Sequence, residues 1–171
     1  HMSDWTVEEK KALRGFDMSL KQRYLAENGS KRKLHKMVGG ARVLPKTVDY
    51  RFPVNGVRIL TAVKDQGQCG SCWTHAAVQS VESAWALASN ELFVLSQQQI
   101  ASCTINPDDC GGTGGCGGGI AELGIDTVAS RTGLNQEWSY PYLSYFGENF
   151  KCNSDAVKNY TKVFTTGYTA V

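Results

Sequence analysis

The sequence contains no apolar run close to the ~20 residues that a membrane-spanning helix needs. It also has no large excess of either charge, since 18 Lys and Arg against 16 Asp and Glu leave a net charge of +2. These absences argue against a membrane protein and against a nucleic-acid-binding protein. At 171 residues, of which 42% are hydrophobic, the chain is long enough for one substantial core or two small ones, so a globular protein is expected.

A signal peptide is also absent, but His1-Met2 has the form of an expression-tag remnant, so this absence does not describe a natural precursor. The charge is spread unevenly along the chain. Residues 1–42 carry ten Lys and Arg against five Asp and Glu, net +5, whereas residues 43–171 carry eight against eleven, net −3. A basic N-terminal segment that docks on an acidic body fits this pattern, and a solvated basic arm fits it equally.

Six cysteines favour an oxidising compartment, although metal or redox chemistry also has to be considered. Two of them lie in Gln66–Trp73, which reads Q-G-Q-C-G-S-C-W. The run from Thr74 to Ala88 contains no Gly or Pro and predicts a buried helix of about four to five turns. Cys72 would then lie at a helix N-terminus, where the unpaired amides favour its thiolate form.

This octapeptide resembles the nucleophile segment of the papain and cathepsin L-like cysteine proteases. The resemblance implies that Cys72 is the nucleophile and that Cys69 forms a disulfide. It also implies that the Gln66 side-chain amide joins the Cys72 backbone N–H in the oxyanion hole. The implied fold is α+β and papain-like: mainly the helical left-hand domain, with a central helix starting at the nucleophile, plus the first strand of the β-rich right-hand domain.

Two further segments extend the resemblance. Ser3–Gly15 resembles the closing part of the inhibitory propeptide of the family, and within it Thr6 and Glu9 can form a capping box at a helix start. Leu44–Arg51 resembles the N-terminus of the mature enzymes. The domain boundaries that follow are an expression remnant at 1–2, a propeptide part at 3–43, a left-hand domain at 44–162 and a truncated, strand-like start of the right-hand domain at 163–171.

Two more helices are predicted after the central one. Leu95–Ile100 begins the first of them, with Ser96 as the N-cap and Gln99 closing a capping box. Ile120–Ala129 forms the second, which ends near Gly133.

The segment Gly111–Gly119 has seven glycines in nine residues and formally contains G-x-G-x-x-G. No strand precedes it, which disfavours a dinucleotide site. Its C-x-G-G end resembles the substrate-binding strip of the family, whose backbone pairs with an extended peptide. The resemblance assigns substrate binding to Gly70, Trp73, Gly118, Gly119, Ile120 and Ala121, the last two as walls of a pocket for the second side chain before the cut bond.

The resemblance also implies two disulfides, Cys69–Cys116 and Cys103–Cys152, and leaves the pairing of Cys110 open. Two alternatives use the same sulfur atoms. A zinc site would be built from Cys69, Cys72, Cys110 and Cys116, and a thioredoxin-like redox pair would use the C-x-x-C of Cys69 and Cys72. The protease interpretation requires no metal and no cofactor.

Histidine is scarce, and this limits the predicted chemistry. The mechanism needs a histidine and an orienting Asn or Asp, which in the family lie roughly 130–150 residues after the cysteine. His1 and His35 are expected to be solvated, and His75 is expected to have a structural or pocket-edge role. We therefore expect these 171 residues to be inactive alone, as a fragment, as one chain of two, or as a half-domain that only binds peptides or an inhibitory partner.

The resemblance implies partners and a location as well. Polypeptide substrates, the propeptide itself, cystatin-type inhibitors and a second chain with the right-hand domain are the partners expected, in a secreted, lysosomal or vacuolar protein. Asn28 and Asn159 each begin an N-x-S/T glycosylation acceptor.

Overall fold

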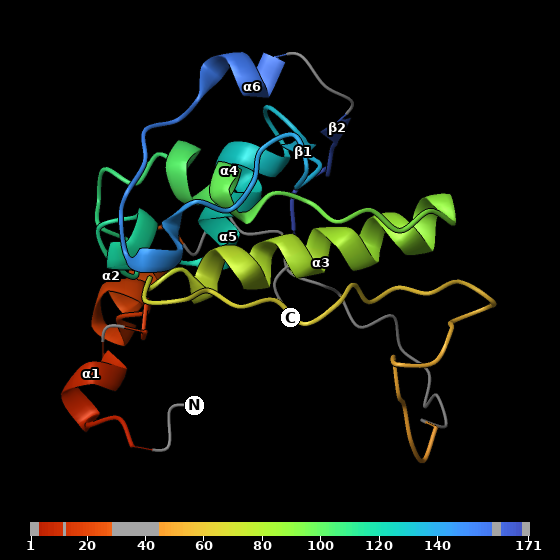
Figure 1. The fold of residues 1–171 in the computed structure, drawn as a ribbon, viewed down its shortest axis with the longest axis horizontal. Coiled ribbons are helices and arrows are strands. Elements are labelled where there is room, and N and C mark those ends of the chain that lie inside the picture. The colour runs from red at the N-terminus through yellow and green to blue at the C-terminus, as the bar shows by residue number, and fades with distance from the viewer. Residues whose placement is uncertain (1–3, 12, 29–44, 159–161, 169–171) are drawn as a thin grey trace.

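A computed structural model describes residues 4–11, 13–28, 45–158 and 162–168. One long helix, α3 (Cys72–Ser89), runs through the molecule, with α4 and α5 on one side and residues 45–65 along the other (Figure 1). The other elements are the α-helices α1 (Val7–Lys11), α2 (Met18–Asn28), α4 (Gln97–Cys103), α5 (Ala121–Gly124) and α6 (Ser154–Lys158), the 3-10 helices η2 (Gly115–Gly117) and η4 (Ser144–Phe146), the π-helix η3 (Ile125–Ala129), and the strands β1 (Leu134–Asn135) and β2 (Lys162–Val163).

Helix α3 forms where the sequence predicts it. The Ser71 carbonyl accepts the N–H groups of Thr74 at 2.9 Å and His75 at 3.3 Å, which closes the first turn. Asn90, in the left-handed conformation with φ 62°, ends the helix. The residues of α3 that face the core recur every three or four positions, as in an amphipathic helix. The apolar ones are Trp73, Ala77, Val78, Val81 and Ala86.

The hydrophobic core lies between α3, α4 and η3. Its buried members come from segments far apart in the sequence and are Trp73, Ala77, Val78, Val81, Leu95, Ile100, Val128, Ala129, Leu134 and Val163. Trp73 directly follows Cys72, so burial of its ring fixes the N-terminal end of α3 against the core. The core thereby determines where the Cys72 side chain lies.

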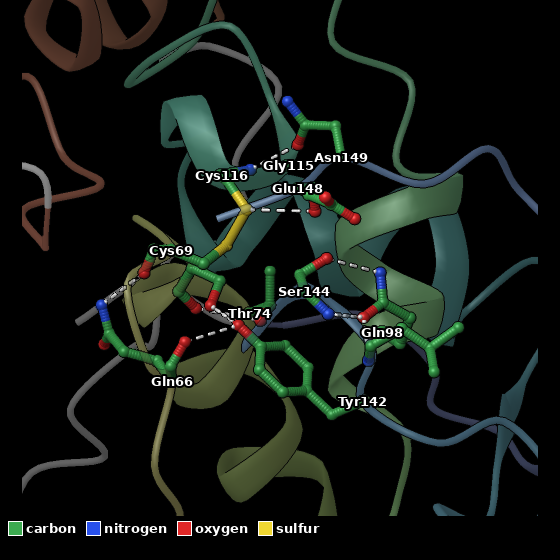
Figure 2. Close-up of a disulfide and its surroundings, with 12 residues drawn as sticks. Gln66, Cys69, Thr74, Gln98, Gly115, Cys116, Tyr142, Ser144, Glu148 and Asn149 are labelled. Atoms are coloured by element: carbon green, nitrogen blue, oxygen red, sulfur yellow. Dashed lines mark hydrogen bonds between the residues drawn. A yellow bond between two sulfur atoms is a disulfide. The ribbon is translucent and has the colours of Figure 1, made fainter. Parts of the chain in front are cut away.

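Helix α4 begins with three consecutive glutamines, Gln97–Gln99, that are almost fully buried. Ser96 is the N-cap as predicted, because its Oγ accepts the Gln99 N–H at 3.0 Å. The other half of the predicted capping box is wrong. The Gln99 side chain instead donates to the Gly133 carbonyl at 2.8 Å and accepts the Asn135 N–H at 2.7 Å. The Gln98 side chain donates to the Ser144 hydroxyl and accepts the Ser144 N–H (Figure 2). The buried amides of α4 thus provide hydrogen-bond partners for polar groups of the loops that pack against this helix.

The predicted helix over 120–129 is present but divided. Its first part is α5, and its second part, η3, is wound as a π-helix. Gly124 lies at the junction, where its backbone packs so closely on Ile100 that a Cβ atom would meet the Ile100 Cγ2 at 2.6 Å. Because glycine has no Cβ atom, the two segments can pack this closely, and the helix changes from α to π geometry at this contact. The segment ends as predicted, with the Gly133 N–H bonded to the Val128 carbonyl at 3.0 Å.

The predicted C-terminal strand is shorter than the sequence indicates. Strand β2 covers two residues and pairs antiparallel with β1, with Val163 opposite Leu134. Residues 164–168 are not in a strand, and 169–171 lie outside the described residues. After the strand, the Thr165 N–H donates to the Ala129 carbonyl at 3.3 Å and not to β1.

The N-terminal part of the chain contains one predicted and one unpredicted helix. The capping box of α1 is confirmed: the Thr6 N–H donates to the Glu9 carboxylate at 2.7 Å, and the Glu9 N–H donates to Thr6 Oγ1 at 3.2 Å. Helix α2 was not predicted. Its start signal is Asp17, whose carboxylate accepts the N–H groups of Ser19 and Leu20. No helix in the described part of the chain has the length and hydrophobicity needed to cross a membrane.

Candidate active site

Cys72 is the first residue of α3 and is partly exposed, and its sulfur is in neither disulfide. Two surface grooves meet at this residue. One is lined by Gln66 and His75, and the other is lined by Ile120 and its neighbours Gly119 and Ala121. A thiol at a helix N-terminus, with open space on both sides, has the access that a nucleophile requires.

Two disulfides hold the surroundings of Cys72 in place. Cys69–Cys116 joins the loop before α3 to the glycine-rich segment (Figure 2), and Cys103–Cys152 joins α4 to the chain before α6. The Gly70 N–H also donates to the Cys116 carbonyl at 3.1 Å. Because Cys69 pairs with Cys116 and not with Cys72, neither a Cys69–Cys72 redox pair nor a zinc site on these thiolates fits the structure.

Cys110 is buried and lies in neither disulfide, and its N–H donates to Asn106 Oδ1 at 2.8 Å. Burial makes this sulfur inaccessible to reagents that reach Cys72. Within the residues that the structure describes, no three His, Cys, Asp or Glu side chains come together as metal ligands.

The side-chain amide of Gln66 bonds to the N-terminal segment of the chain. Its Nε2 donates to the backbone carbonyl of Leu13 at 2.9 Å and to that of Cys69 at 2.7 Å. One of its donors thus already binds a carbonyl oxygen supplied by a separate segment of chain. An oxyanion hole requires such a preplaced donor beside the nucleophile.

Tyr142 lies beside Gln66 (Figure 2) and connects it with Ser71, the N-cap residue of α3. Its hydroxyl donates to the Gln66 backbone carbonyl at 2.9 Å and lies 2.6 Å from Ser71 Oγ. A phenol has one proton to donate, so Ser71 must be the donor in the second bond. Burial raises the pKa of Tyr142, and the nearby Asp65 carboxylate adds to this, which keeps the hydroxyl protonated. The bridge fixes the position of Gln66 relative to the start of α3.

His75 lies one turn after Ser71 and faces Tyr142. Its Nδ1 is 3.0 Å from the Ser71 carbonyl, and its ring meets the Tyr142 ring edge-on at 5.2 Å. A carbonyl can only accept, so this contact requires the proton on Nδ1. Among the described residues, no hydrogen bond joins His75 to the Cys72 sulfur. The geometry therefore agrees with the structural or pocket-edge role predicted for His75.

Replacing His75 by phenylalanine is expected to change acid stability and not thiol reactivity. Burial lowers the pKa of His75 from its ordinary value of 6.5, and the Lys64 charge lowers it further. The unfolded chain therefore binds this proton more readily, and stability falls as the pH drops below 6.5 toward the folded pKa. Urea titrations at neutral pH and at about pH 5 should show a smaller acid loss in His75→Phe. Abolished alkylation of Cys72 would contradict this role.

The glycine-rich strip forms the other wall of the site. Trp73 Nε1 donates to the Gly115 carbonyl at 3.0 Å, which joins α3 to the strip. The Gly119 N–H donates to the Gly15 carbonyl at 3.0 Å, and the Gly118 backbone lies directly beside Gly15. Of the residues that the sequence assigned to catalysis and substrate binding, Gln66 and Cys72 line one groove, and Cys72, Trp73, Gly119, Ile120 and Ala121 line the other. Gly70 and Gly118 lie beside Gly15.

Chain from the N-terminal segment lies across this groove. Gly15 is buried, and a Cβ atom there would lie 1.6 Å from the Gly70 carbonyl oxygen, so only glycine fits. Phe16 lines the groove beside Ile120, and the Asp17 N–H donates to the Gly111 carbonyl at 3.0 Å. Helix α2 then docks on the body through an ion pair between Lys21 and Glu122 at 3.3 Å.

Of the two glycosylation candidates, only Asn28 lies within the described residues. Asn28 ends α2, and the rest of its acceptor sequence lies outside the described residues, as does Asn159.

Comparison with known proteins identifies the class. The papain family cysteine protease model matches residues 44–171. Among curated proteins, vignain from Ricinus communis is 36% identical over 132 residues, covering 70% of this chain and 34% of vignain. Cysteine proteinase B from Leishmania mexicana is 41% identical over 115 residues, covering 66% and 24%. The chain therefore belongs to the papain family of cysteine proteases.

Solved structures show the same likeness. A structure from work on the mite allergens Blo t 1 and Der p 1 superposes with a TM-score of 0.76 at 26% identity, covering 99% of this chain and 51% of that one. The proform of the ragweed cysteine protease Amb a 11 gives 0.66 at 28% identity, covering 94% and 46%. This chain matches only 21% to 36% of the length of each of these curated relatives and others like them.

Proposed function

We propose that this chain is the propeptide end and left-hand domain of a papain-like cysteine endopeptidase, with Cys72 as the nucleophile and Gln66 as an oxyanion donor. The observation that carries the proposal is the bond from Gln66 Nε2 to the Leu13 carbonyl, because Gln66 also lines the groove that adjoins Cys72. A scissile carbonyl held by this donor would have its oxygen stabilised as negative charge develops.

The proposed reaction proceeds through a thioester. The Cys72 thiolate attacks the carbonyl carbon, and the oxyanion is stabilised by Gln66 and the Cys72 backbone N–H. The carbon–nitrogen bond then breaks, the amine leaves with a proton, and water hydrolyses the thioester. Proton transfer needs an imidazole that faces the sulfur, and we place it, with its orienting Asn, in a part of the protease other than these residues. These residues alone would not turn over peptides.

We also propose that residues 3–43 form the end of an inhibitory propeptide. The family match begins at residue 44, and the likeness to the Amb a 11 proform covers 94% of the chain. Phe16 lines the groove beside Ile120, Gly15 and Asp17 bond to the glycine-rich segment, and the net charges of +5 on residues 1–42 and −3 on the rest attract each other. Acid would weaken this attraction as carboxylates are protonated. Polypeptide substrates, cystatin-type inhibitors and a secreted, lysosomal or vacuolar location belong to the same proposal.

Substitution of Gly15 tests the blocking role. In the full-length protease with residues 1–43 still attached at neutral pH, Gly15→Ala should weaken inhibition by roughly tenfold or more, because the methyl group clashes with Gly70. The measurement is the initial rate on a peptide amide before any cleavage of the segment. Glu8→Ala changes an exposed residue of the same segment and should leave the rate low. Full activity of the unsubstituted protein with the segment attached would refute the blocking role.

A further inference from the structure

A third groove lies beside Gln66, and none of its lining residues lines the groove at Gly119. Its volume is about 510 Å³, and the body lines it with residues 64–68 and with Tyr145 and Phe146. We call these two aromatic residues the aromatic shelf. Phe146 is 77% exposed, more than any other aromatic residue among those whose burial the structure describes.

The aromatic shelf is held rigidly by the loop that carries Gln66. The Tyr145 carbonyl accepts the Gln68 N–H at 2.7 Å, and the Tyr145 hydroxyl donates to Asp65 at 3.1 Å. The Phe146 ring meets the Tyr145 ring edge-on at 5.3 Å. Gln98 anchors the preceding Ser144 through its buried amide (Figure 2). The exposed ring is therefore presented by a fixed support.

The N-terminal segment shows which path a peptide can take past the shelf. Trp5 and Leu13 line the shelf groove, Gly15 bonds to Gly119, and Phe16 lies in the groove beside Ile120. One stretch of chain thus passes from the aromatic shelf, past Gln66, to the glycine strip. Apolar side chains of this protein already line the shelf groove.

From this geometry we infer that the aromatic shelf binds an apolar side chain of the substrate on the leaving-group side of the cut bond. The inference rests on the proposed function, in which the glycine strip holds the acyl side. The leaving peptide must then pass Gln66 in the other direction, and the first apolar surface it meets there is Tyr145 and Phe146. Trp5 and Leu13 occupy this place until the N-terminal segment is removed.

The test uses the full-length protease after removal of residues 1–43 and three substrates with the same acyl part. The first ends in a coumarin amide at the cut bond, the second continues with leucine and phenylalanine, and the third continues with glycine and serine. Phe146→Ser should lower kcat/KM for the second substrate by about five- to tenfold, the scale of partly burying one aromatic ring. The coumarin amide and the third substrate should change little, because neither places an apolar side chain on the shelf.

Phe52→Ser is the matched control, since Phe52 is 68% exposed and lies outside the groove. It should leave all three rates unchanged. Equal losses on the coumarin amide and the apolar peptide, or no loss on either, would overturn the role of the aromatic shelf and leave the protease function standing. No hydrolysis of any of the three by the unsubstituted enzyme would overturn both.

Discussion

A Gln66→Ala variant of the full-length protease, freed of residues 1–43, should lose about 10²–10³ in kcat on a peptide amide, the usual effect of removing one oxyanion donor. The reason is geometric. Gln66 lines the groove at Cys72, its Nε2 donates at 2.9 Å to a backbone carbonyl of the N-terminal segment, and Tyr142 holds the Gln66 backbone in position. Alanine keeps the backbone and removes the donor. Steady-state kinetics at several substrate concentrations separate the loss in kcat from any change in KM.

Gln136→Ala provides the control for this variant. Gln136 lies beside Leu95 and accepts a hydrogen bond from Trp138, away from both grooves at Cys72. Its loss should leave kcat near that of the parent enzyme. If the two variants had the same kcat, the assignment of Gln66 as an oxyanion donor would be wrong.

Replacing Lys64 by methionine should lower the free energy of unfolding by about 3–5 kcal/mol, because it leaves a buried carboxylate without its cation. Glu82 is fully buried, and its Oε2 lies 2.9 Å from Lys64 Nζ. The same carboxylate accepts the Thr61 hydroxyl at 2.6 Å and the Leu95 N–H at 2.8 Å. These bonds hold the chain before Cys72 against α3. Urea unfolding followed by tryptophan fluorescence measures the change.

Two further variants decide the cause of that loss. Lys64→Met combined with Glu82→Gln should recover most of it, since the amide keeps the acceptor for Leu95 and carries no charge. Lys151→Met, at an exposed lysine, should change stability by less than about 0.5 kcal/mol. A double variant as unstable as Lys64→Met would show that the buried charge is not responsible.

Local sequence signals predicted the parts of the fold that depend on neighbouring residues. The absence of Gly and Pro after Trp73 predicted α3, and the pattern at Thr6 and Glu9 predicted the capping box of α1. The Ser96 cap was predicted for the same reason. In each case the hydrogen bond joins residues three or four apart, so the sequence window contains both partners.

The parts that were missed depend on residues far apart in the chain. Nothing near Gln99 indicates that its side chain bonds to Gly133 and Asn135, and nothing near Glu82 indicates a buried ion pair. The Tyr142 hydroxyl reaches Gln66 across 76 positions. Tertiary packing decides these bonds, and it also overrides the predicted regular helix where Gly124 meets Ile100. Helix α2 is different, because its capping signal at Asp17 was local and visible in the sequence.

Labelling with a peptidyl epoxide at about pH 5 tests the central claim most directly, since such a reagent must meet an accessible, activated thiolate. Full-length protease freed of residues 1–43 should take up one adduct quickly, and peptide mapping should place it on Cys72, with none on the buried Cys110. Protein that keeps residues 1–43 should react more slowly, because Leu13 and Gly15 already bond to Gln66 and Gly119. An unmodified Cys72 after removal of the segment would contradict the account and favour a half-domain that binds without cleaving.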